Sequence, residues 1–109
     1  MPAVTVENIL TLPRLAEPDA ATATERALAA PVKKPAPGNA RTVNARAATW
    51  KSDQGSGASG SATVTKIETE PSGSECRTVR EVAYIKGEEV VQNSRYCRSG
   101  DGEWQAVSA

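Results

Sequence analysis

Apolar and polar residues alternate along much of the second half of the chain, and this period of two is typical of half-buried β-strands. The pattern is clear in Ala62–Thr69, and two longer runs rich in Val, Thr, Tyr and Ile follow at Glu75–Ile85 and Glu88–Arg98. Shorter runs at Ala47–Lys51 and Glu103–Val107 complete the set. The sequence therefore predicts a mainly β fold built on a small antiparallel sheet of four to five strands.

The two longest runs are separated by Lys86-Gly87, which predicts a tight β-hairpin because glycine supplies the positive φ that such a turn needs. With a two-residue loop Ile85 faces Glu88, and counting outward along both strands brings Cys76 opposite Cys97. This is a non-hydrogen-bonded pair, whose Cα atoms lie about 4.5 Å apart, within the range of about 4.4–6.8 Å that a disulfide accepts. A four-residue loop would leave the two sulfurs apart. Turn and spacing thus predict the same register and a Cys76–Cys97 disulfide.

The hairpin pattern leaves open which of its faces is buried. One face carries Cys76, Thr78, Arg80, Val82 and Tyr84, the other carries Val79, Ala83 and Ile85 near Tyr96, and neither is cleanly polar. Beyond the hairpin, Ser99–Gly102 forms a second turn. This turn brings Trp104 back towards Arg98, so we expect a guanidinium–indole contact there.

Composition divides the chain near residue 46. Six of its 7 prolines lie within the first 37 residues, whereas all four aromatic residues and both cysteines lie at or beyond Trp50. We therefore expect an extended Pro/Ala-rich arm and linker at residues 1–46 and a disulfide-stapled β domain at 47–109. A domain of this size buries a marginal core, so a disulfide closing a loop of about 20 residues, worth roughly 3 kcal/mol, is a large part of its stability.

The start of the arm contains an apolar segment, Val4–Leu12, in which β-branched residues favour extended structure. It is either a disordered terminus or a peptide that adds to a partner's sheet edge or groove. We predict the second, with these partner-binding residues: Val4, Val6, Ile9, Leu10 and Leu12.

The rest of the arm is predicted to set the distance between the apolar segment and the β domain. Residues 19–30 can form an Ala-rich helix with Asp19 as N-cap, and since Leu28 is its one large apolar residue we interpret it as a spacer. Residues 31–46 contain Pro31, Pro35 and Pro37 and predict a semi-rigid, extended linker.

Residues that carry chemistry are scarce. The chain has no histidine, two cysteines alone do not make a zinc site, and the serines have no partner base. Gly55–Gly60 matches the dinucleotide fingerprint formally, but a strand follows it where the fingerprint requires a helix. Asp101 and Glu103 read as solvated turn residues. We expect no enzyme activity, no catalytic residue, no cofactor and no metal.

The formal net charge is zero, with 13 basic and 13 acidic residues and no basic stripe, so no nucleic-acid partner is expected. No apolar run approaches the roughly 18 residues of a membrane span, and the N-terminus lacks a basic signal-peptide region. A paired disulfide points to an oxidising compartment such as a periplasm or cell exterior. Two reduced cysteines in a cytosolic protein are the alternative.

The pattern of Cys76-Arg77, the Gly-turned hairpin, Tyr96-Cys97-Arg98 and then Gly100–Trp104 resembles the C-terminal domain of the rickettsial 17-kilodalton surface antigen family of bacterial envelope lipoproteins. The likeness extends upstream through Thr49-Trp50 and Ala62–Thr69, so it covers about residues 47–107. It implies a periplasmic or cell-surface protein associated with the outer membrane. The family's lipobox cysteine and glycine-zipper segment have no counterpart here, and a lipid anchor could have been lost with a removed N-terminus.

Two functions remain. The first is a non-catalytic structural or accessory subunit of a bacterial envelope assembly, whose N-terminal arm docks on a larger envelope protein. The second is a small secreted binding or inhibitor module that uses a hairpin loop for recognition. A long arm favours the first, because an inhibitor does not need it.

Overall fold

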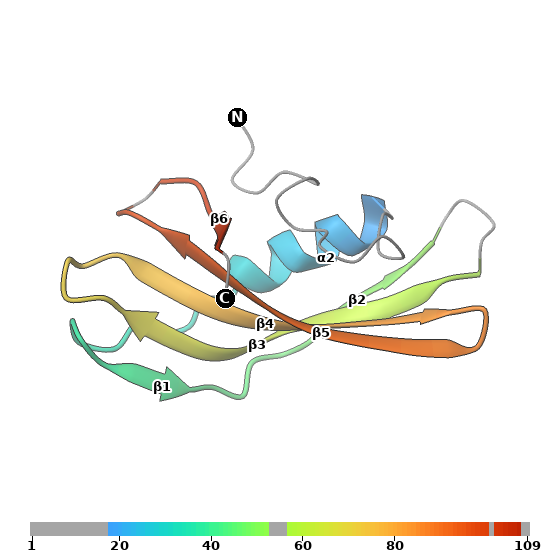
Figure 1. The fold of residues 1–109 in the computed structure, drawn as a ribbon, viewed down its shortest axis with the longest axis horizontal. Coiled ribbons are helices and arrows are strands. Elements are labelled where there is room, and N and C mark those ends of the chain that lie inside the picture. Colours follow the sequence, from blue (N-terminus) through green and yellow to red (C-terminus); the bar gives the residue numbers. More distant parts are fainter. Residues whose placement is uncertain (1–17, 53–56, 101, 108–109) are drawn as a thin grey trace.

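A helix lies across one face of a strongly twisted antiparallel sheet in the computed structural model (Figure 1). The structure describes residues 18–52, 57–100 and 102–107. The elements are α2 (Pro18–Leu28), β1 (Ala40–Thr42), β2 (Ala48–Lys51), β3 (Ser59–Thr69), β4 (Glu75–Ile85), β5 (Glu88–Arg98) and β6 (Gln105–Val107).

The strands follow the order β1-β3-β4-β5-β6, and β2 also pairs with β3. Strands β1 and β2 share one side of β3: β1 pairs with Lys66–Glu68 and β2 with Ser59–Ala62. A bulge between Val64 and Lys66 shifts the register of β3 against β4, and bulges of this kind increase the local twist. The predicted mainly β, antiparallel fold is confirmed. Six strands are described rather than four to five, because β1 lies in the segment predicted to be a linker.

The predicted hairpin is confirmed throughout its length. Lys86 and Gly87 both have positive φ, 52° and 79°, as a type I′ turn requires. Pairing then runs without a break from Ile85–Glu88 to Glu75–Arg98. Cys76 and Cys97 face each other with Cα atoms 4.0 Å apart and form the predicted disulfide.

The face of the hairpin that carries Val79 and Ala83 is the buried one. Both side chains are fully covered, and Val79 packs with Val64, Ile67 and Tyr96 in the core beneath the helix. The opposite face of β4 and β5 has no covering element among the described residues, and on it Tyr84 and Val91 are 48% and 42% exposed. The sequence pattern left this choice open because each face carries both apolar and polar residues.

Helix α2 is a packed element, so the prediction that it is a spacer is wrong. Its buried stripe consists of Ala20, Ala21, Ala23, Thr24, Ala27 and Leu28. These positions recur at the helical period, and side chains this small let the helix backbone lie close to the sheet. Its alanines are small and alternate with threonines and charged residues, which is why the sequence pattern alone understated the burial of this helix.

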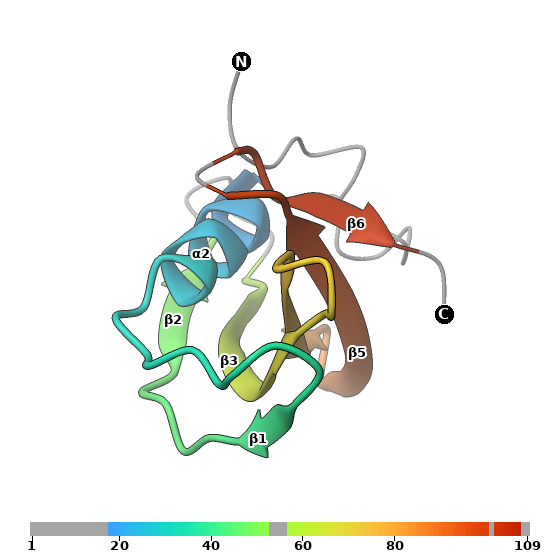
Figure 2. The same ribbon diagram turned by 90° about the vertical axis from the view of Figure 1, so that its left-hand side faces the viewer.

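Residues 31–46 are also held against the sheet (Figure 2). The Thr69 hydroxyl donates to the Pro35 carbonyl at 2.7 Å, and the Gly38 N–H donates to the Thr69 carbonyl at 2.7 Å. Val32 and Val43 pack at the margin of the core. The extended arm predicted for residues 1–46 is therefore wrong for residues 18–46, which belong to the same packed unit as the sheet. Residues 1–17 lie outside the described part of the chain.

Gly60, the last glycine of the dinucleotide-like pattern, lies within β3 beneath Trp50. A Cβ atom there would run into the Val82 carbonyl oxygen and lie 2.7 Å from the Trp50 indole nitrogen. The glycine is thus required for close packing, and a strand follows it as the sequence predicted.

We predict that Leu28→Ala lowers the free energy of unfolding by about 2–5 kcal/mol, the usual cost of a cavity at a buried leucine. The matched control is Arg26→Ala on the exposed side of the same helix, expected to change stability by less than about 0.5 kcal/mol. Urea denaturation followed by tryptophan fluorescence measures both. Equal, small effects of the two substitutions would restore the spacer interpretation.

Candidate binding surface

An apolar group of side chains lies on the helix-free face near the tip of the hairpin. Val82 and Val91 face each other across β4 and β5, and Tyr84 lies two residues further along β4. We call Val82, Tyr84 and Val91 the hairpin patch. Val82 is covered by its neighbours, whereas Tyr84 and Val91 are exposed. An aromatic and an aliphatic side chain exposed side by side can contact a partner.

The hydroxyl of Tyr84 is oriented by Glu89, its cross-strand partner. A hydrogen bond to the Glu89 carboxylate and the negative charge of that group raise the pKa of Tyr84. Tyr84 presents its ring at the surface, beside the Glu89 carboxylate.

The edge of β5 beside this patch is uncovered in the described structure. In the described part of the chain, β6 pairs with Arg95–Cys97, at the far end from the turn (Figure 2). Within the described ranges no strand pairs with the outer side of residues 88–94, which we call the open β5 edge. Unpaired N–H and C=O groups on such an edge can accept another strand. Glu88 and Glu89 place negative charge at its start, which disfavours pairing between copies.

A buried carboxylate supports the open edge from the helix side. Glu81 is 5% exposed, and its Oε2 accepts hydrogen bonds from the hydroxyls of Thr24 and Tyr96, both at 2.9 Å. Its Oε1 accepts from the Ser94 hydroxyl at 2.6 Å and from the Gln92 amide at 3.3 Å. A buried carboxylate is tolerated when its lone pairs are satisfied in this way. The network ties the helix to β4 and to the two polar residues of the edge strand.

Tyr96 is the most buried member of this network, with no exposed surface. Its burial, and then the charge of Glu81 and the hydrogen bond to it, raise the pKa of Tyr96 far above its ordinary value of 10.0. The phenol therefore remains a hydrogen-bond donor as long as the protein is folded.

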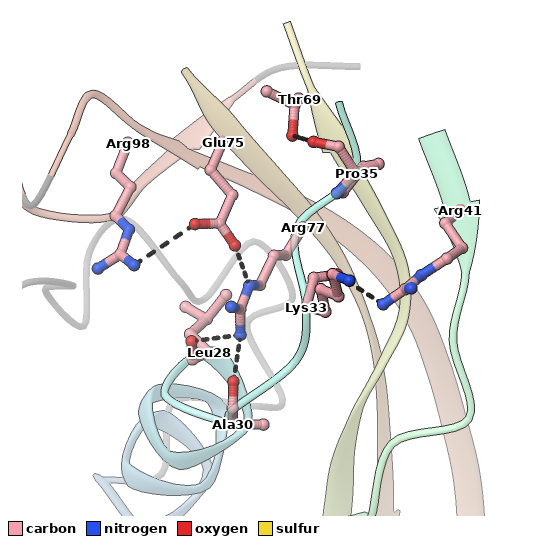
Figure 3. A network of polar contacts seen from close by, with 9 residues as sticks. All are labelled: Leu28, Ala30, Lys33, Pro35, Arg41, Thr69, Glu75, Arg77 and Arg98. Atoms are coloured by element: carbon pink, nitrogen blue, oxygen red, sulfur yellow. Dashed lines mark hydrogen bonds and ion pairs between the residues drawn. The ribbon is translucent and has the colours of Figure 1, made fainter. Parts of the chain in front are cut away.

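A second buried network holds the other end of the helix (Figure 3). Arg77, 5% exposed, donates to the carbonyl oxygens of Leu28 at 2.8 Å and Ala30 at 2.9 Å. These carbonyls lie at the C-terminal end of α2, where a helix lacks its own donors. The Arg77 Nε also pairs with Glu75 at 2.7 Å, so the buried guanidinium is both neutralised and hydrogen-bonded.

The predicted contact between Arg98 and Trp104 is confirmed. The Arg98 guanidinium carbon lies 4.5 Å from the centroid of the indole ring, and that of Arg77 lies 5.3 Å away. Arg98 also pairs with Glu75 at 3.4 Å. Trp104, 4% exposed, thus completes the network and fixes the chain between β5 and β6.

The predicted site residues divide into two sets. Cys76 and Cys97 are bonded, whereas Val4, Val6, Ile9, Leu10 and Leu12 lie outside the described residues, so their role stays a prediction. Sequence reasoning missed Glu81 and Arg77. Their signal was the two-residue spacing of Arg77, Val79, Glu81 and Ala83, which puts the two charged residues on what proves to be the buried face.

The described surface carries open clefts. One of about 500 Å³ lies between the β3–β4 turn and the β5–β6 turn, lined by Glu70, Ser74, Arg98 and Gln105 among others, with Cys97 at its side. Within the described ranges, no three His, Cys, Asp or Glu residues are grouped so that they could hold a metal ion. Nor does any described helix have the length and apolar character to cross a membrane.

Comparison with protein families, curated proteins and solved structures finds no match to this chain.

We predict that the two tyrosines titrate separately. Tyr84 should ionise reversibly somewhat above pH 10, whereas Tyr96 should ionise only when the protein unfolds. Because the unfolded chain loses the Tyr96 proton above pH 10 and the folded one keeps it, this group's contribution to stability is complete below pH 10 and falls as pH rises beyond it.

Absorbance of the phenolate against pH measures this difference, with Tyr96→Phe as the comparison. That variant should lose the late, unfolding-linked step and keep the early one. Two early, reversible ionisations in the parent protein would contradict the buried Tyr96–Glu81 bond.

Proposed function

We propose that this chain is a non-catalytic binding protein of an oxidising compartment, such as the bacterial envelope, and that its Val4–Leu12 segment docks on a larger envelope partner. The observation that carries the proposal is the Cys76–Cys97 disulfide across the central hairpin, since such bonds persist in oxidising compartments. The resemblance to the surface antigen family supports the same location.

The described residues form one packed unit, which we call the frame. Two buried polar networks and a disulfide hold the helix, the hairpin and the end of β5 together. The Glu81 carboxylate and the Arg77 guanidinium within them are held by several hydrogen bonds each, which suits a scaffold better than a reactive site. A protein of this design acts through its surface and its attached segment.

Because helix α2 packs on the sheet, the Val4–Leu12 segment is attached closer to the frame than the sequence had suggested. Because the packed unit begins by residue 18, only residues 13–17 separate it from Leu12. Six residue steps reach about 20 Å when fully extended. The larger partner would therefore lie close against the frame, where the sequence alone had suggested a long semi-rigid spacer.

The second candidate, a binding or inhibitor module that acts through the hairpin, is favoured by the exposed Tyr84 and Val91 beside the turn. Aromatic residues are over-represented among the residues that dominate binding energy at protein interfaces. In this case the hairpin patch, rather than the N-terminal segment, would contact the partner.

The decisive experiment compares recovery of envelope proteins by four immobilised chains: the parent, a variant with Ile9, Leu10 and Leu12 changed to Ser, one with Tyr84→Ser and Val91→Ser, and the control Thr5→Ser. Burying three aliphatic side chains contributes roughly 1.5–3 kcal/mol each before ordering costs, so we expect the first variant to lose recovery by more than tenfold.

The control should bind as the parent does. Loss of recovery only in the Tyr84/Val91 variant would replace the proposed function with the hairpin module. Equal recovery by all four chains would reject both.

A further inference from the structure

Positive charge is concentrated in one stretch of the chain, although the net charge of the whole is zero. No acidic residue lies between Glu25 and Asp53. The same stretch carries five basic residues, which we call the basic flank: Lys33, Lys34, Arg41, Arg46 and Lys51. A strand edge can be kept from aggregating by charges of either sign. Five of one sign with none of the other therefore point to an anionic partner.

The fold brings the basic flank to one long edge of the sheet, on the side away from β5 and β6 (Figure 2). Strands β1 and β2 pair with the same side of β3, from Ala40 opposite Glu68 to Lys51 opposite Ser59. Nine residue steps of β3 separate these two rows, so the edge is about 30 Å long. All five basic side chains are exposed, and among the described residues none of them is in an ion pair.

The cations stand on both faces of this edge. Arg41 faces Ile67, whose side chain is buried in the core beneath the helix, so Arg41 lies on the helix side. Lys51 shares a row of the sheet with Tyr84, so it lies on the helix-free side. Arg46 lies between them, in the connection from β1 to β2. A ligand on one face would reach part of this set, whereas a surface that approaches the edge meets all of it.

A groove with apolar side chains opens beside these cations. It measures about 500 Å³ and lies between Pro31 and Val32 on one side and residues 41–45 on the other, with Val43 in its lining. Arg41, which also lines it, donates to the Lys33 carbonyl oxygen at 2.5 Å (Figure 3). Cations beside apolar side chains suit the boundary between the headgroups and the acyl chains of a lipid layer.

The opposite edge of the sheet carries the other sign of charge. The open β5 edge begins with Glu88 and Glu89. At one end of the basic flank lies Glu68, and its carboxylate is paired with Arg95 at 3.3 Å. An anionic surface would attract one edge of the sheet and repel the other, so it would orient the whole frame.

We propose that the basic flank binds edge-on to the surface of an anionic phospholipid bilayer. A bilayer presents its charge as a plane, with an apolar layer beneath it. Each Lys or Arg near an anionic membrane strengthens binding by roughly fivefold, and this attraction falls off within a Debye length of about 8 Å at physiological salt. The inference concerns a surface that the proposed function does not use, and it does not depend on the Val4–Leu12 segment.

The test measures co-sedimentation of the full-length chain with vesicles of phosphatidylcholine, either alone or mixed equally with phosphatidylglycerol. We expect binding to the mixed vesicles only, and its loss when NaCl is raised from about 0.1 M to about 1 M. Lys34→Gln combined with Arg46→Gln should weaken the binding more than about tenfold, because two cations of the flank are removed.

Two matched variants separate the position of the charge from its amount. Arg80→Gln with Lys86→Gln removes two exposed cations that lie at least two strand spacings, or about 10 Å, from the flank. This variant should bind within about threefold of the parent, since its changes lie beyond the Debye length. Lys34→Arg with Arg46→Lys keeps both charges and should bind as the parent does.

Acetylation of lysines, followed by mass spectrometry, tests the orientation on the bilayer. Lys33, Lys34 and Lys51 should react several times more slowly when the mixed vesicles are present. Lys86, in the hairpin turn, should react at the same rate with and without them. Equal protection of all four lysines would overturn the edge-on contact.

No binding to the mixed vesicles, or equal weakening by the two glutamine variants, would overturn the proposal. Binding to heparin or to polyglutamate under conditions in which the vesicles are not bound would overturn it too, because the partner would then be an anionic polymer. The assay contains no envelope protein, so its failure leaves the proposed function standing, and failure of the recovery experiment leaves this inference standing.

Discussion

Strand β4 holds the helix at two points through charged side chains that are themselves buried. Glu81 bonds to Thr24 in the middle of α2, and Arg77 bonds to the carbonyls at its end. An alanine stripe gives little apolar area and no large side chain to fix the helix in position, apart from Leu28. The polar contacts fix the orientation that this stripe leaves undetermined. Removing a hydrogen-bond partner of Glu81 or Arg77 would leave part of a buried charge unsatisfied, which costs more than replacing both partners by apolar groups.

The hairpin could be predicted residue by residue because its determinants are local. Lys86-Gly87 sets the turn, the turn sets the register, and the register brings Cys76 and Cys97 together. The packing of α2 and the strand at Ala40–Thr42 could not be predicted in this way, since both depend on contacts with residues distant in sequence. The proline content also gave a wrong prediction for residues 31–46. Pro35 is not part of an extended linker, because its carbonyl accepts a hydrogen bond from the Thr69 hydroxyl.

The candidate surface shows the same division. Tyr84 and Val91 are visible in the sequence, but their exposure follows from the choice of buried face, which depends on the helix. Among the described residues, the open β5 edge lies beyond the last β5–β6 pair, Arg95 with Val107. Both features result from what the neighbouring elements fail to cover, and a local pattern carries no information about such coverage.

The position of the disulfide has a mechanical consequence. Because Cys76 and Cys97 join the roots of the two hairpin strands, tension applied along the chain passes from residue 76 to residue 97 through the sulfur atoms. The loop between them carries no load. A protein anchored at one end and pulled at the other would lose its helix and outer strands, whereas residues 77–96 would remain a closed loop that is not stretched.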